Sequence, residues 1–280
     1  MSDASERKLE RRVSERSGRS AETTGHRVSA DTAEWMRWHE RGKKILGVVG
    51  GLGPETGFRF SLNINDKFKA ETGSQPHLIV VNLPITGESE ERLIHGGVSE
   101  EHFRLLEETM ALFNKAKVDL IAIPCNTVHV FIEELRAISK APILSILEET
   151  AKKAAGLGIR CAGLLSSTKT VNERLHANEL DKTGIAVIVP DNNAQGFVSD
   201  CIVRIINREA TADDRHKLLE IMKGMERRGA QGIILGCTDL PLLISEPDAG
   251  LPVINTIAVL EDAVVSRLLE TAELRKGPVN

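Results

Sequence analysis

The chain alternates short apolar runs with longer stretches in which apolar positions recur every three to four residues. Each apolar run is largely continuous, which is typical of strands buried on both faces of a sheet. The runs cover residues 45–50, 78–83, 120–123, 143–146, 162–165, 186–189, 233–235 and 253–254. The helical stretches cover residues 101–116, 130–139, 148–156, 170–183, 198–207 and 213–229. Strand followed by helix, repeated along the chain, predicts an α/β protein with mostly parallel sheets flanked by helices.

Two segments of the chain resemble each other. Ile-Ala-Ile-Pro-Cys-Asn-Thr and Ile-Ile-Leu-Gly-Cys-Thr-Asp each place a cysteine and hydroxyl or amide residues directly after a strand. This internal similarity predicts two related α/β lobes, over residues 45–147 and 148–254. A C-terminal helix within 255–280 is expected to cross back and join the first lobe.

The N-terminal segment, residues 1–44, differs from the rest. Its first part is rich in Ser, Arg and Glu and nearly lacks large aliphatic residues, so we expect it to be disordered. A capping box beginning at Asp31 predicts a short helix over 32–41. This helix carries Trp35 and Trp38 on one face. That face is expected to pack on the parent domain, and a partner or dimer contact is the alternative.

Composition then excludes several classes of protein. In 280 residues, 36 basic side chains face 40 acidic ones, which argues against a nucleic-acid partner. No apolar run approaches the roughly 18 residues of a membrane span, and the charged N-terminus is unlike a secretory signal. Four cysteines are too few and too widely spaced for a disulfide scaffold, and CxxC and HExxH metal motifs are absent. We therefore expect a cytoplasmic protein with reduced thiols, no metal site and no membrane partner.

Two of the four cysteines occupy positions suited to chemistry. Cys125 and Cys237 each follow a predicted strand, and sites assemble at the carboxyl ends of parallel strands. A cysteine there meets exposed N–H groups at the start of the next helix, which favours the thiolate and brings the pKa of the thiol toward neutrality. Asn126, Thr127 and Thr238 add donors suited to a carboxylate.

A thiol on each of two opposed lobes is suited to one reaction in particular. One thiolate removes a proton from a carbon, and the opposite thiol returns a proton to the other face, which inverts a stereocentre without a cofactor. The alternative is that both are buried structural thiols, since free cysteine is among the most buried residue types. Cys161 and Cys201 are interpreted as core residues.

Other polar residues near these positions carry weaker signals. His129, one turn after Cys125, either tunes the thiol or faces the interface between the lobes. We expect the remaining candidates, His95, His102, His176 and His216, to face solvent. The acidic run over 88–101 is interpreted as a flexible loop and a candidate lid.

Three motifs closely resemble those of the aspartate/glutamate racemase family, whose members work without pyridoxal phosphate. They are Gly-Gly-Leu-Gly-Pro at 50–54, Pro-Cys-Asn-Thr-Val-His at 124–129 and Leu-Gly-Cys-Thr-Asp-Leu-Pro at 235–241. Their order and spacing agree with the family, and the resemblance covers about residues 45–275. It implies two pseudo-symmetric lobes with the active site in the cleft between them. It also implies a small amino-acid substrate, no cofactor and a homodimer.

The resemblance also assigns roles to individual residues. Cys125 and Cys237 are the acid/base pair that inverts the α-carbon of the substrate. The α-carboxylate is assigned to Asn126, Thr127 and Thr238. Gly51 and Leu52 are expected to line the cleft. The absence of Asp-Ser-Gly in the first loop, and of a histidine after the second Cys-Thr, favours the aspartate racemase branch over the glutamate racemases.

Some positions depart from the family pattern. Asp239 stands where the family usually has Glu. The arginine that binds the distal carboxylate of aspartate is replaced by Glu88 or Ser89, unless Arg92 shifts into its place, and a family lysine corresponds to Asn207. A distal carboxylate would then be poorly paired. We therefore hypothesise an amino acid other than aspartate as substrate, either neutral or basic.

Two alternatives to a racemase remain open at this point. A cofactor-free decarboxylase or isomerase of the same superfamily would need only one working cysteine, so the presence of both favours racemisation. A non-catalytic protein that binds an amino acid or a partner is the other alternative, and reactive-looking turns at both cysteines argue against it.

Overall fold

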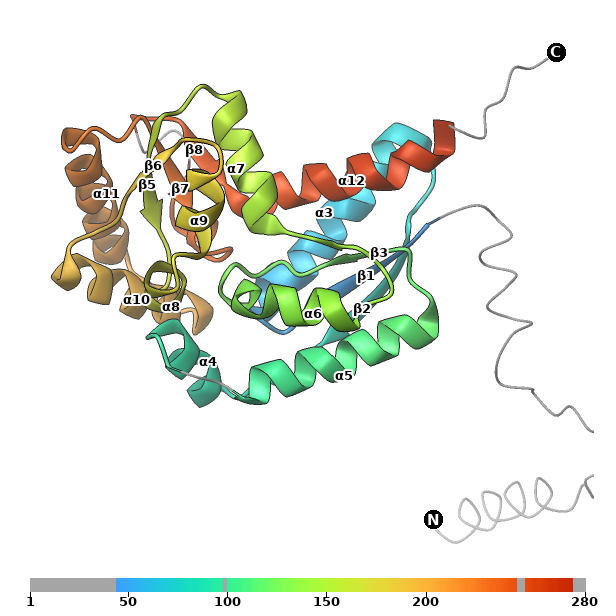
Figure 1. The fold of residues 1–280 in the computed structure, drawn as a ribbon. Coiled ribbons are helices and arrows are strands. Elements are labelled where there is room, and N and C mark those ends of the chain that lie inside the picture. The colour runs from blue at the N-terminus through green and yellow to red at the C-terminus, as the bar shows by residue number, and fades with distance from the viewer. Residues whose placement is uncertain (1–43, 98–99, 246–249, 274–280) are drawn as a thin grey trace, which may run out of the picture. The chain divides into compact units, whose positions relative to one another are not determined.

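The computed structural model describes residues 44–97, 100–245 and 250–273. The tryptophan-bearing helix expected over 32–41 lies outside these residues. Within them, two four-stranded parallel sheets follow one another along the chain (Figure 1). The first contains β1 (Ile45–Gly50), β2 (His77–Asn82), β3 (Leu120–Ala122) and β4 (Ile143–Leu144), in the order β2-β1-β3-β4. The second contains β5 (Cys161–Leu165), β6 (Ala186–Ile188), β7 (Gly232–Leu235) and β8 (Val253–Asn255), in the order β6-β5-β7-β8.

Helices connect the strands. Those of the first half are α3 (Pro54–Thr72), α4 (Gly87–Ile94), α5 (Glu100–Ala116), the 3₁₀-helix η1 (Thr127–Phe131), α6 (Ile132–Ile138) and α7 (Ile146–Gly156). Those of the second half are α8 (Thr168–Asn172), α9 (Leu175–Asp181), α10 (Asn192–Ile206), α11 (Ala212–Arg227), the 3₁₀-helix η2 (Leu240–Leu242) and α12 (Thr256–Glu273). The two sheets share one strand order, so the predicted pair of similar α/β lobes is confirmed.

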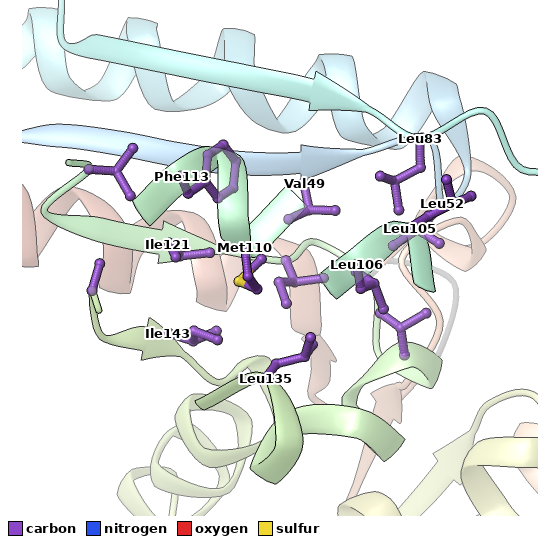
Figure 2. Packing of buried hydrophobic residues seen from close by; sticks show 14 of the residues in the cluster. Val49, Leu52, Leu83, Leu105, Leu106, Met110, Phe113, Ile121, Leu135 and Ile143 are labelled. Carbon is purple, nitrogen blue, oxygen red and sulfur yellow. The ribbon is translucent and has the colours of Figure 1, made fainter. Parts of the chain in front are cut away.

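Helices cover both faces of the first sheet. On β1, Ile45 and Val49 pack into a core with α5 and α6, which Figure 2 shows around Phe113. The intervening Leu46 and Val48 pack into a second core with α3, α7 and α12. Because both faces are covered, β1 is buried throughout and its sequence is apolar without alternation.

The second sheet is built in the same way. Leu165, Ile233 and Leu235 pack with α10 and α11, whereas Leu164 and Ile234 pack with α7 and α9 on the opposite face. Helix α7 contributes side chains to cores of both sheets. Helix α12 runs back from the second sheet to pack against α3 and α7, as Figure 1 shows.

Three expectations about helices need correction. The acidic run over 88–101 is not a loop, because Thr86 caps α4 and α5 begins at Glu100. The single helix expected over 170–183 is broken at Arg174, whose φ of 53° is left-handed. Helix α3 was not expected, although Phe60, Ile64 and Phe68 recur at helical spacing on its buried face.

No helix in the described part of the chain is long and apolar enough to cross a membrane.

Substitution of Phe113 tests the core of the first lobe. Phe113 is fully buried, and its ring lies against Gly47 of β1, where an added Cβ would meet it at 3.0 Å. We expect Phe113→Ala to lower the free energy of unfolding by about 3–5 kcal/mol, measured by urea denaturation. The neighbouring Leu112→Ala is the control, because Leu112 is 47% exposed. Equal losses in the two variants would contradict this packing.

Candidate active site

A pocket lies where the central strands of the two sheets end. In the first sheet these are β1 and β3, and in the second they are β5 and β7. The pocket is lined by Leu52, Glu90, Leu93, Ile94, His102, Cys125, Asn126, Thr127, Ser167, Ile202, Ile206, Cys237, Thr238 and Asp239. The two lobes therefore contribute equivalent strand ends to one site.

The pocket brings Cys125 and Cys237 together. Cys125 follows β3 and precedes η1, and Cys237 follows β7 and precedes η2. Both are free thiols, so they are not joined to each other. Cys237 is buried and Cys125 is partly buried. Cys201 lies in the core of the second lobe, as expected, and Cys161 is a partly buried residue at the start of β5.

The protonation of these thiols differs from the expectation. Burial raises the pKa of Cys125 to about 12, and the negative charge of Asp239 acts in the same direction. Burial, again with the charge of Asp239, raises the pKa of Cys237 well above its ordinary value. Backbone N–H groups at the start of η1 and η2 lower both pKa values, but less than burial raises them. In the pocket as it stands, both cysteines are therefore thiols.

Asp239 is placed beside the second thiol. Its carboxylate accepts a short hydrogen bond from the Thr56 hydroxyl and lies 3.8 Å from Sγ of Cys237. Burial raises the pKa of Asp239 to about 6. The glycine loop after β1 makes room for this group. At Gly53, with a left-handed φ of 76°, an added Cβ would lie 2.7 Å from the carboxylate.

Glu90 lines the pocket, although it is not among the site residues predicted from the sequence. Helix α4 carries it, and Leu93 and Ile94 follow at i+3 and i+4 on the same face. Its Oε1 accepts a 2.9 Å hydrogen bond from the backbone N–H of Gly53. Burial, together with the charge of Asp239, raises the pKa of Glu90 to about 7. The helical spacing of Glu90, Leu93 and Ile94 could have identified this helix in the sequence, but these residues belong to the acidic run that was interpreted as a loop.

Arg92 lies outside this pocket. Its guanidinium pairs with Glu88 one turn earlier on α4, at 2.7 Å, and its side chain is 59% exposed. Asn207 is exposed at the end of α10, while the preceding Ile206 lines the pocket. Gly51 packs against the backbone of Leu83 and is not a lining residue. Among the lining residues there is no lysine or arginine.

The side chain of Asn126 joins elements from distant parts of the chain. Its Nδ2 donates to the Thr256 hydroxyl at 3.1 Å, and its Oδ1 accepts from Nε2 of His176 at 2.9 Å. The Thr256 hydroxyl donates onward to the carbonyl of Leu235 at the end of β7. Asn126 therefore fixes the start of η1 against α9 and α12, which positions the loop that carries Cys125.

Hydroxyl groups from both lobes meet at the pocket wall. The Thr127 hydroxyl lies 2.9 Å from that of Ser167 and accepts a hydrogen bond from Thr170. Ser167 follows β5 and caps α8. Ser167 is not among the site residues predicted from the sequence, although its place after β5 corresponds to that of the glycine loop after β1.

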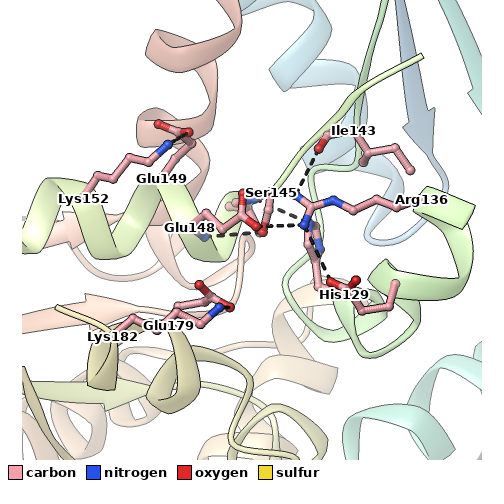
Figure 3. Close-up of polar contacts among 11 residues, drawn as sticks. His129, Arg136, Ile143, Ser145, Glu148, Glu149, Lys152, Glu179 and Lys182 are labelled. Carbon is pink, nitrogen blue, oxygen red and sulfur yellow. Dashed lines mark hydrogen bonds and ion pairs between the residues drawn. The ribbon is translucent and has the colours of Figure 1, made fainter. Parts of the chain in front are cut away.

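His129, which Figure 3 shows beside Arg136, contacts the backbone of Cys125 rather than its thiol. Its Nδ1 lies 2.7 Å from the carbonyl of Cys125, and its Nε2 accepts from the N–H of Ile146 at 3.4 Å. Burial lowers the pKa of His129 to about 4, so the ring is neutral. Beside it, Arg136 makes two hydrogen bonds to Glu148 at the start of α7. These contacts link η1 and α6 to α7.

The expected exposure of the other histidines is wrong in two cases. His102 and His176 are fully buried, and burial lowers the pKa of each below its ordinary value. His216 is exposed, as expected, and His95 lies at the surface near Asp200. Burial of a histidine depends on partners distant in sequence, so amphipathic surroundings did not reveal it.

The pocket is small, with a free volume of about 30 Å³. In the described part of the chain, no group of three or more His, Cys, Asp or Glu is arranged to hold a metal ion.

Comparisons with known proteins agree with this arrangement. The model of the Asp/Glu/hydantoin racemase family matches residues 49–264, more than half of the chain. The broad specificity amino-acid racemase RacX of Bacillus subtilis (strain 168) is 25% identical over 230 residues. That alignment covers 80% of this chain and 98% of RacX.

Solved structures also resemble this one. A candidate Asp/Glu racemase from Yersinia pestis is 28% identical with a TM-score of 0.71, over 81% of this chain and 99% of that one. The aspartate racemase of Picrophilus torridus shares the fold, with a TM-score of 0.67 at 23% identity over 82% and 94% of the two chains. Because the family match spans both lobes and both strand-end cysteines, this chain belongs to the Asp/Glu/hydantoin racemase family, a family of isomerases.

Proposed function

We propose that the protein is a cofactor-independent amino-acid racemase in which Cys125 and Cys237 exchange the α-proton from opposite faces of the substrate. One observation carries this proposal. Two free thiols, at equivalent strand ends of two similar lobes, line the same pocket. A decarboxylase or a binding protein would not need such a matched pair.

In the proposed reaction the α-proton moves to one thiolate and a second proton returns from the opposite thiol. The substrate passes through a planar carbanion, and its charge is delocalised into the α-carboxylate. After each turnover the thiol and thiolate have exchanged roles, so the protons balance and reaction in the reverse direction restores the starting state. Thr127, Ser167 and Thr238 lie at the pocket wall, where their hydroxyls suit the α-carboxylate.

Binding of the substrate's α-ammonium group would lower the raised pKa values of the two thiols. The negative charges of Asp239 and Glu90 raise the pKa of Cys125, and that of Asp239 raises the pKa of Cys237. A cation bound beside these carboxylates would offset their effect and favour a thiolate. Asp239, which lies next to Sγ of Cys237, is our candidate for the α-ammonium.

The charges of the pocket also argue against an acidic side chain on the substrate. Its lining residues include two carboxylates and neither lysine nor arginine. A distal carboxylate would be unpaired and close to like charges, which is costly in a buried site. The broad specificity named for RacX supports a substrate outside the acidic amino acids.

Isotope exchange tests the reaction class and the substrate together. In deuterated water the wild-type protein should place deuterium at the α-carbon of its substrate while inverting it, in a screen of the common L-amino acids. Cys125→Ser and Cys237→Ser should each lower kcat/KM for racemisation by about 100-fold or more. Each should retain at most exchange without inversion, because one base remains.

Cys161→Ser is the matched control, since Cys161 lies at the start of β5 and does not line the pocket. It should racemise at the wild-type rate. Undiminished racemisation by both pocket variants would contradict the two-thiol mechanism.

The pH dependence of thiol alkylation tests the electrostatics. Because burial and the charge of Asp239 raise the pKa of both thiols, iodoacetamide should modify them slowly at neutral pH and faster as pH rises. Asp239→Asn removes the negative charge, so the rise should move to lower pH by about one unit. Mass spectrometry of the Cys125 and Cys237 peptides would measure this. Asp213→Asn, at an exposed position on α11, is the control, and identical profiles for wild type and Asp239→Asn would contradict the assignment.

A further inference from the structure

We infer that Glu90 selects the side chain of the substrate, and that it binds a cationic group, an amine or a guanidinium, at the end of an aliphatic chain. This inference rests on the proposed racemase function. It names the substrate class of the same pocket and assigns a specificity role to a residue on α4.

Glu90 lies at the pocket wall with an uncharged hydrogen-bond partner. Its helix places the carboxylate at the pocket wall, where the backbone N–H of Gly53 binds Oε1 at 2.9 Å. This donor is neutral. Among the described lysines and arginines, none forms an ion pair with Glu90. A partly buried carboxylate whose partner is neutral keeps an uncompensated charge, and a cation from the substrate would pair with it.

Nearby cations already have other partners. Arg92, two residues along α4, pairs with Glu88. Arg208, just beyond the end of α10, pairs with Glu55 at 3.1 Å. His102, the histidine that lines the pocket, is buried with a lowered pKa and is therefore neutral. The charge of Glu90 is thus left for a ligand.

The two carboxylates can be assigned to different parts of the substrate. Asp239 lies next to Sγ of Cys237 and so next to the carbon that loses its proton, which suits the α-ammonium group. Glu90 belongs to the first lobe and Asp239 to the second. Gly53 lies between the two carboxylates, because its N–H binds Glu90 and its Cα faces Asp239. A substrate with a single cation would leave one carboxylate unpaired. A substrate with two cations would pair both.

The remaining wall suits the stem of such a side chain. Leu93 and Ile94 flank Glu90 on α4, and the other apolar lining residues are Leu52, Ile202 and Ile206. Long cationic side chains bury their methylene groups against apolar surface while the charged end contacts a polar partner. The pocket combines these two features, an apolar wall and a carboxylate.

The wild-type protein provides the first arm of the test. In the deuterium-exchange assay, kcat/KM for lysine and arginine should exceed that for methionine, a neutral side chain of similar length. It should also exceed that for aspartate and glutamate. Preference for aspartate or glutamate would overturn the inference and leave the racemase function in place. Exchange with no amino acid would overturn both.

Substitution of Glu90 provides the second arm. Glu90→Gln keeps the size of the side chain and an oxygen for the N–H of Gly53, but it removes the charge. It should lower kcat/KM for lysine and arginine by roughly 30-fold or more, and that for methionine by less than about three-fold. Glu88→Gln is the control, because Glu88 is an exposed glutamate on the same helix whose side chain is outside the pocket.

The comparison between substrates distinguishes a specificity role from a structural one. If Glu90 only holds the Gly53 loop, Glu90→Gln should impair lysine and methionine equally, and that result would overturn the inference. The wild-type preference for lysine over methionine does not depend on the folding of any variant.

Discussion

A parallel strand covered by helices on both faces can offer polar groups only at its ends. This constraint organises the whole of the described structure. The first sheet is apolar on both faces, and so is the second, so hydroxyls, amides, thiols and carboxylates gather in the loops that follow the strands. Because the strands of each sheet are parallel, their carboxyl ends all lie at the same edge of that sheet. A pocket formed by two such edges is lined by Cys125, Cys237 and Asp239.

Charge within that pocket is the second determinant. Two carboxylates and two thiols, four potential anions, lie together where burial disfavours every ionised form. Neutral donors such as the Thr56 hydroxyl and the N–H of Gly53 stabilise the carboxylates without neutralising them. Under the proposed function, the pocket therefore favours ligands that carry positive charge, and the ionisation of its thiols depends on what is bound. A free enzyme with un-ionised thiols is also protected from adventitious alkylation or oxidation.

The parts of the fold that follow from local pattern were predictable from sequence. Continuous apolar runs identified the eight strands of the described residues within a residue or two. In β1, β3 and β7, burial on both faces leaves no polar positions. The repeated strand–cysteine segment indicated two lobes and brought attention to Cys125 and Cys237. The residues whose places were not predicted depend on tertiary structure. Glu90 lies in a short acidic helix that was interpreted as a loop, although Leu93 and Ile94 follow it at helical spacing. His176 is buried where Asn126, fifty positions earlier, provides its partner.

The return of α12 to the first lobe has a consequence for synthesis on the ribosome. The core on one face of the first sheet includes Ile257, Leu260 and Val264, which are translated after the whole second lobe. Until they emerge, Leu46 and Val48 on that face lack part of their cover. The N-terminal lobe therefore cannot complete its folding first, as sequential domains usually do. The contact of Asn126 with Thr256 must likewise wait for α12, so the proposed active site is complete only after α12 has been translated.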